Sequence, residues 1–181
     1  MPSKVLLSGA QLELLLHRLA WQLIENHQDF SNTVLVGLQP RGVILLEELM
    51  AIIKKEQPQS KLTFGKLDTT FFRDDFRRST KIHTANSTEM EVQVENKKVV
   101  FIDDVLFTGR SIRAALTAIN SYGRPESVEL LVLVDRRFSR HLPIQPDYVG
   151  AQIDAFEGDR VRVNWEQQLQ KSNVYLEEGN S

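Results

Sequence analysis

The hydrophobic positions along the chain change between two spacings, and the change predicts a series of helices and strands. A capping box at Ser8–Gln11 precedes leucines at helical intervals, which predict a helix over residues 9–26. Similar spacing predicts helices over residues 43–55 and 110–122. Gly123 then stands where a helix ends in the left-handed conformation.

Short runs of consecutive apolar residues lie between the helices. They show little polar alternation, as expected for strands that are covered on both faces. The predicted strands cover residues 33–38, 61–67, 98–104 and 127–134, with shorter strand-like stretches at 147–150 and 160–163. Strands that alternate with helices indicate an α/β fold around a central parallel sheet.

Two segments are mainly polar. Residues 68–89 are too long for an ordinary connection and are typical of a functional loop or a solvated hairpin arm. The alternating pattern of residues 91–95 suits one side of such an arm. The tail after Trp165 is polar, and we expect it to fray.

Composition narrows the class of protein. The 181 residues, 41% of them hydrophobic, are enough for one domain with an ordinary core. The net charge of −2 gives no strong overall attraction to nucleic acid or membranes, although local basic patches remain open. No cysteine is present, which excludes disulfides, thiolate catalysis and cysteine-bound zinc. The first seven residues turn polar too early for a signal peptide, so we expect a soluble, cytoplasmic protein.

The candidate chemistry starts where the most apolar strand ends. Asp103 and Asp104 follow the run Val99–Ile102, at the strand edge where open α/β sheets bind ligands. Two adjacent carboxylates are costly to desolvate unless a partner neutralises them or donates hydrogen bonds. Sugar hydroxyls and a nearby Mg²⁺ would do so.

The turn that follows these acids supplies hydrogen-bond donors for an anion. Thr108, Gly109, Arg110 and Ser111 open a helix, whose backbone N–H groups and positive dipole end attract an anion. Carboxylates for a diol beside donors for a phosphate predict a pocket for a ribose 5-phosphate.

Three other kinds of site share some features of this segment. The metal-binding strand of a P-loop ATPase also ends in acids, but the chain has no G-x-x-x-x-G-K-[ST] loop. A phospho-receiver aspartate pocket does not account for the Thr-Gly-Arg-Ser turn. A strand that simply ends in capping acids stays open.

Several segments resemble one protein family. Val99–Ser111 resembles the phosphoribosyl pyrophosphate (PRPP) signature of type I phosphoribosyltransferases. The branch is indicated by segments similar to its pyrophosphate loop, its L-D-I-T-L-Y-R-D-D-L stretch and its base-binding region, which are residues 36–42, 67–76, 134–136 and 142–150. That branch is the PyrR family of bifunctional pyrimidine operon regulators and uracil phosphoribosyltransferases. The resemblance covers residues 8–163.

The resemblance implies a fold and a reaction. The fold would be a single type I phosphoribosyltransferase domain over residues 1–181, with a flexible arm at 68–97 and a small hood at 135–165. The reaction would convert uracil and PRPP into UMP and pyrophosphate. Mg²⁺ would arrive bound to PRPP rather than on a metal site of the protein, and the chain would form a homodimer.

The resemblance also implies roles for individual residues. Asp103 and Asp104 would hold the ribose hydroxyls, with Asp104 near the reacting carbon, while Arg41 and the Gly42 amide would face pyrophosphate. Arg73 would close over pyrophosphate, although an ion pair with a neighbouring acid is an equal alternative. The catalytic set is Asp103, Asp104 and Arg41. The PRPP-binding set is Gln39, Pro40, Arg41, Gly42, Arg73, Asp103, Asp104, Val105, Leu106, Phe107, Thr108, Gly109, Arg110 and Ser111.

The base-binding set implied by the resemblance is Asp135, Arg136, Tyr148 and Val149. Tyr148 would stack on uracil and the Val149 backbone would bind its edge, with packing inside the hood as the alternative for Tyr148. The four histidines, His17, His27, His83 and His141, lack metal-ligand spacing and are expected to be ordinary core or surface residues.

The chain departs from the family at some positions. Pro40 stands where the family usually has Thr, and related enzymes place a cis peptide near this point, so we expect a cis Gln39–Pro40 bond. RNA-binding members carry Thr and His on the first helix where this chain has His17 and Trp21, although Arg18 is kept.

The hood departs as well, with Gln145 and Ala151 at positions that are basic in RNA-binding members. These changes favour an enzyme over an RNA-binding, UMP-sensing regulator. A phosphoribosyltransferase of another base, such as hypoxanthine, is a third option that residues 67–76 argue against.

Overall fold

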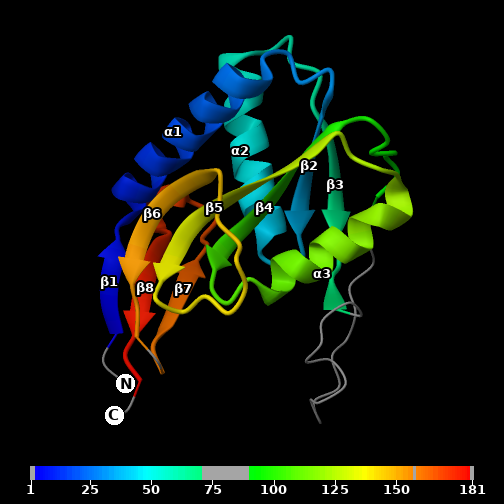
Figure 1. Ribbon diagram of the computed structural model, residues 1–181. Helices are drawn as coiled ribbons and strands as arrows, with labels where there is room; N and C mark the ends of the chain where they lie inside the picture. The colour runs from blue at the N-terminus through cyan, green and yellow to red at the C-terminus, as the bar shows by residue number, and fades with distance from the viewer. Residues whose placement is uncertain (1–2, 71–89, 157, 180–181) are drawn as a thin grey trace.

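The central sheet of the protein is parallel and five-stranded. The computed structural model describes residues 3–70, 90–156 and 158–179. The sheet order is β3-β2-β4-β5-β6, and every neighbouring pair is parallel (Figure 1). Its strands are β2 (Thr33–Leu38), β3 (Thr63–Leu67), β4 (Lys98–Leu106), β5 (Ser127–Arg137) and β6 (Tyr148–Asp154). The predicted α/β architecture is therefore confirmed.

Helices cover both faces of this sheet. Helices α1 (Gly9–His27) and α2 (Gly42–Glu56) lie on one face, and α3 (Arg110–Ile119) lies on the other (Figure 1). A short 3₁₀ turn, Asn120–Tyr122, extends α3 to the predicted end of that helix. The predicted capping box at the start of α1 is present.

The two faces explain why the strands showed no polar alternation. Leu35, Val100 and Ile102 join the core formed with α1 and α2. Their chain neighbours Val36 and Phe101 point the other way, into the core formed with α3. Successive side chains of a strand point to opposite faces, so both sets must be apolar.

A second, antiparallel sheet brings the two ends of the described chain together. Its order is β1-β8-β7, built from β1 (Ser3–Leu7), β7 (Arg160–Asn164) and β8 (Asn173–Glu177) (Figure 1). The expectation of a frayed tail after Trp165 was wrong, because β8 is the central strand and its Val174 is fully buried.

Two local predictions were also wrong. Residues 91–95 form no strand, and the side chain of Val94 is instead buried in the core beside α3. Gly123 has φ +123° and ψ 179°, which is an extended backbone that only glycine adopts readily rather than the left-handed helical end. Glu95 also leaves no room for a side chain at Gly123, because its backbone N would lie 2.8 Å from an added Cβ.

The helices of the described ranges, 3–70, 90–156 and 158–179, were compared with the length and hydropathy that a bilayer requires. None of them is long and apolar enough to cross a membrane.

Candidate active site

Two carboxylates mark the site at the end of β4. Asp104 is 4% exposed, and its backbone N–H donates a 2.9 Å hydrogen bond to Asp103 Oδ1. Its Oδ2 atom is buried without a hydrogen-bond partner among the described residues, and Arg41 Nη1 lies 3.6 Å from it. Burial raises the pKa of Asp104, while the Arg41 charge works in the opposite direction. A buried acceptor of this kind fits a ligand hydroxyl or a cation.

The turn before α2 places positive charge against these acids. The Gln39–Pro40 bond is cis, as predicted, and the Gln39 amide donates to the Leu67 carbonyl at 3.0 Å. A Cβ on Gly42 would lie 2.2 Å from the Ile102 carbonyl oxygen and 3.1 Å from Asp103 Cα. Only glycine therefore lets the positive N-terminus of α2 reach the carboxylate pair.

The Thr108–Ser111 turn begins α3 at the same sheet edge. Gly109 has φ +90° and precedes the first residue of the helix. The Arg110 amide lies 3.4 Å from Thr108 Oγ1, and the His141 amide donates to the Thr108 carbonyl at 3.1 Å. The predicted phosphate turn is therefore tied to the loop over residues 138–147.

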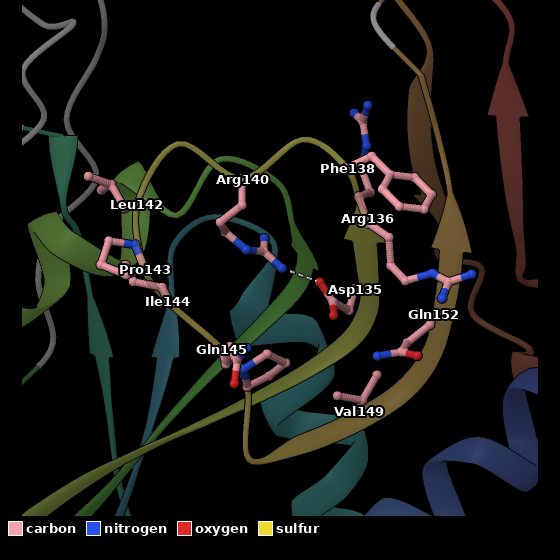
Figure 2. A pocket seen from close by; sticks show the side chains of 12 residues that line it. Asp135, Arg136, Phe138, Arg140, Leu142, Pro143, Ile144, Gln145, Val149 and Gln152 are labelled. Atoms are coloured by element: carbon pink, nitrogen blue, oxygen red, sulfur yellow. Dashed lines mark hydrogen bonds and ion pairs between the residues drawn. The ribbon is translucent and has the colours of Figure 1, made fainter.

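That loop covers a cavity of about 710 Å³ at the ends of β5 and β6 (Figure 2). The lining residues are Asp135, Arg136, Arg137, Phe138, Arg140, Leu142, Pro143, Ile144, Gln145, Pro146, Val149 and Gln152. Three of the four predicted base-binding residues, Asp135, Arg136 and Val149, are among them.

An ion pair lies in the wall of this cavity. Asp135 and Arg140 point toward each other in Figure 2 and form a short ion pair. Arg140 also donates to the Phe107 carbonyl at 2.5 Å, so it joins the end of β4 to the end of β5. No local sequence pattern indicates this role, because the contact between residues 107 and 140 exists only in the fold.

Arg136 is buried against an aromatic ring. Its guanidinium carbon lies 4.0 Å from the centre of the Phe107 ring, and its Nε has no hydrogen-bond partner in the described part of the chain. Burial lowers the pKa of Arg136, and the charge of Asp159 partly offsets this. The Arg136 side chain thereby stacks on a residue of the predicted PRPP segment.

Tyr148 lies apart from the cavity. It is 4% exposed, and its hydroxyl donates to Glu129 at 2.7 Å and accepts from Asn26 at 3.0 Å. His27 Nε2 lies 3.1 Å from the same oxygen, and burial lowers the pKa of His27. The expected stacking role does not fit this position, and the packing alternative describes Tyr148.

Two further predictions concern Arg73 and a bound metal ion. Arg73 lies outside the described residues. Within the described part of the chain, no group of three or more His, Asp or Glu side chains could hold a metal ion. The Asp103–Asp104 pair nevertheless offers the carboxylate oxygens that Mg²⁺ prefers, which suits an ion carried by a phosphorylated substrate.

The fold and this site match one class of proteins. A family model described as a phosphoribosyl transferase domain matches residues 3–168, so the chain belongs to the phosphoribosyltransferases. It is 40% identical over 173 residues to the Bifunctional protein PyrR of Haemophilus ducreyi, covering 96% of each chain. It is 42% identical over 158 residues to that of Synechocystis, covering 87% of each. Within the class, the chain is a member of the PyrR family.

Solved structures show the same fold at low identity. A hypoxanthine phosphoribosyltransferase from Staphylococcus aureus superposes with a TM-score of 0.65 at 23% identity, covering 86% of this chain and 79% of that one. A glutamic acid mutant from a study of an invariant aspartic acid in HPRTs gives 0.71 at 14% identity, with 94% of each chain covered.

Proposed function

We propose that this phosphoribosyltransferase joins uracil to PRPP and releases UMP and pyrophosphate. One observation carries the proposal: the N-termini of α2 and α3 begin at the sheet edge where β4 carries Asp103 and Asp104 near its C-terminal end. Two anion sites beside a carboxylate pair suit a sugar with a phosphate at one end and a diphosphate at the other. Membership of the PyrR family favours uracil as the base.

Each part of PRPP has a candidate partner. The Asp103 and Asp104 carboxylates accept hydrogen bonds from the ribose hydroxyls, and the buried Asp104 Oδ2 gains the partner that it lacks. The Thr108–Ser111 turn donates to the 5-phosphate. Arg41 and the start of α2 face pyrophosphate and stabilise the charge that it gains as it leaves.

The sugar develops positive charge when the bond to pyrophosphate weakens. Asp104 is placed to stabilise that charge, because its carboxylate is held in a poorly solvated position. Mg²⁺ bound to PRPP would neutralise charge on the leaving group, with Asp103 and Asp104 as its nearest acids.

The base would enter the cavity under residues 138–147. Val149 lines that cavity, so its backbone groups are candidates to read the edge of uracil. Asp135 and Arg140 supply one acceptor and several donors next to the Phe107 end of the PRPP segment. The base and the sugar sites therefore share residues at one sheet edge.

The direct test is product analysis. Purified protein with Mg²⁺, PRPP and uracil is expected to form UMP and pyrophosphate in equal amounts. The proposal fails if neither product appears while PRPP stays intact.

The relatives' name, Bifunctional protein PyrR, keeps RNA-binding regulation as a second candidate. Three described arginines that could supply positive charge for RNA, Arg18, Arg137 and Arg140, already bond to other groups of the protein, which weighs against it. Arg137 makes two hydrogen bonds to Asp154, at 2.6 and 2.9 Å, and Arg140 pairs with Asp135. Arg18 donates to backbone carbonyls of β6.

A further inference from the structure

Arg18 of α1 contacts the backbone of the strand that borders the base cavity. Its Nη2 atom donates to the Val149 carbonyl at 2.7 Å and also to the Gly150 carbonyl. Helix α1 lies alongside β6, the last strand of the parallel sheet (Figure 1). Among the described strands none pairs with the outer edge of β6, so a side chain supplies hydrogen bonds that a strand would otherwise make.

The other side of this segment is fixed by close packing. A Cβ on Gly150 would lie 2.3 Å from the Leu133 carbonyl oxygen, so the backbone of β6 approaches β5 more closely than any other residue would permit. The segment is therefore held between Leu133 on one side and the Arg18 guanidinium on the other.

The same segment lines the cavity. Val149 and Gln152 both contribute to its wall, whereas Arg18 does not (Figure 2). A hydrogen bond from a charged donor is roughly twice as strong as one between neutral groups. A shift of this backbone would move the Val149 groups that are proposed to read the base.

We infer that Arg18 is a positioning residue for the nucleobase, which it affects through the Val149–Gly150 backbone. The inference rests on the proposed function of the cavity. It assigns to a surface side chain of α1 a role in base affinity and none in PRPP binding.

Helix α1 does not depend on Arg18 for its attachment. Its leucine face, formed by Leu12, Leu16, Leu19 and Leu23, is fully buried. Near its C-terminal end, Asn26 and His27 contact the Tyr148 hydroxyl. Loss of the Arg18 contacts should therefore disturb β6 locally and leave the helix in place.

The test compares Arg18→Met, which removes the donors, with Arg18→Lys, which keeps the charge. Arg162→Met is the matched control, since Arg162 contacts Glu177 in the second sheet at 3.1 Å and does not line the cavity. For Arg18→Met we expect the KM of the base to rise roughly tenfold, about 1.4 kcal/mol. The KM of PRPP and kcat should stay within about twofold, Arg18→Lys should be intermediate, and Arg162→Met should match the wild type.

Amide hydrogen exchange over residues 148–152 is measured on the same proteins. Faster exchange confined to this segment in Arg18→Met, together with the base-specific rise in KM, supports the inference. An unchanged base KM overturns it, and so does an equal rise in both KM values. If the wild type uses no base, the proposed function fails by that result alone, and unchanged exchange at 148–152 separately overturns the positioning role.

Discussion

Asp104 shows how a residue can be placed for chemistry at a cost to stability. Its carboxylate is almost fully buried, and one oxygen has no hydrogen-bond partner. Arg41, at 3.6 Å, is too far for a hydrogen bond and is itself about half exposed, so it compensates only part of the burial. Such uncompensated groups are typical of binding sites, where a ligand completes the contacts.

Replacing both acids should remove the activity and leave the fold. For Asp103→Asn with Asp104→Asn we expect a loss of at least about 10³-fold in kcat/KM with PRPP, because both proposed ribose contacts weaken. Circular dichroism should match the wild type. Asp29→Asn, which changes an exposed acid near the opposite, N-terminal end of β4, is the control; near-normal turnover by the double variant would contradict the proposed pocket.

The single change Asp104→Asn should raise stability. Burial raises the pKa of Asp104 in the folded protein above its ordinary value of 3.8, so the charged form is less favourable folded than unfolded. The variant should therefore have a higher Tm than the wild type at neutral pH. Because the wild type becomes protonated as the pH falls through the raised folded pKa toward 3.8, the difference in Tm should shrink there. A lower Tm for the variant at neutral pH would contradict this account.

Contiguous residues of the site could be predicted, and residues joined only by the fold could not. Asp103 to Ser111 form one run, in which the adjacent carboxylates and the phosphate-binding turn could be predicted from the sequence. Arg140 contacts a carbonyl 33 positions away, and Arg18 contacts one 131 positions away. No local pattern encodes such contacts, and for the same reason the sequence did not place Tyr148 against His27.

Among the helices and strands, too, those with a clear local pattern were predicted and those stabilised by distant contacts were missed. Strands β2 and β4 were predicted because burial on both faces demands an uninterrupted apolar run. Strands β1 and β8 were missed because Val174 is the one residue in them that is fully buried, so neither shows a run of core residues. Their stability comes from pairing with each other and with β7, which brings together the two ends of the described chain.

Removal of β8 should test the importance of this sheet. A chain that ends at Ser172 loses the central strand and the buried Val174, which leaves β1 and β7 without their partner. We expect a clearly lower Tm and exposed apolar surface that binds a hydrophobic dye. A chain that ends at Gly179 is the control, and equal Tm values would show that the tail carries no structural role.

The residues of the candidate active site lie together at one edge of the parallel sheet. The starts of α2 and α3, the ends of β4 and β5, and the loop over residues 138–147 meet there. The hydrogen bond from Arg140 to the Phe107 carbonyl links the proposed PRPP segment to the proposed base cavity. This arrangement serves two substrates that must react with each other.

The contacts of three arginines bear on the prediction for RNA binding. Arg18, Arg137 and Arg140 each already bond to another group of the protein. The hood positions 145 and 151 are uncharged, so we expect its own pyrimidine-operon leader to bind no better than unrelated RNA at physiological salt. Dissociation constants of about 10⁻⁴–10⁻⁶ M are typical of such non-specific binding. A gel-shift assay with and without UMP measures this; a tight, UMP-stimulated and sequence-selective shift would restore the regulatory function.

The central claim is that this site transfers the phosphoribosyl group of PRPP to uracil. A single competition reaction tests it most directly, with limiting PRPP, Mg²⁺ and equal amounts of uracil, hypoxanthine and guanine. The account predicts UMP as the main nucleotide product. A purine nucleotide as the main product would contradict it and assign the cavity to a purine base.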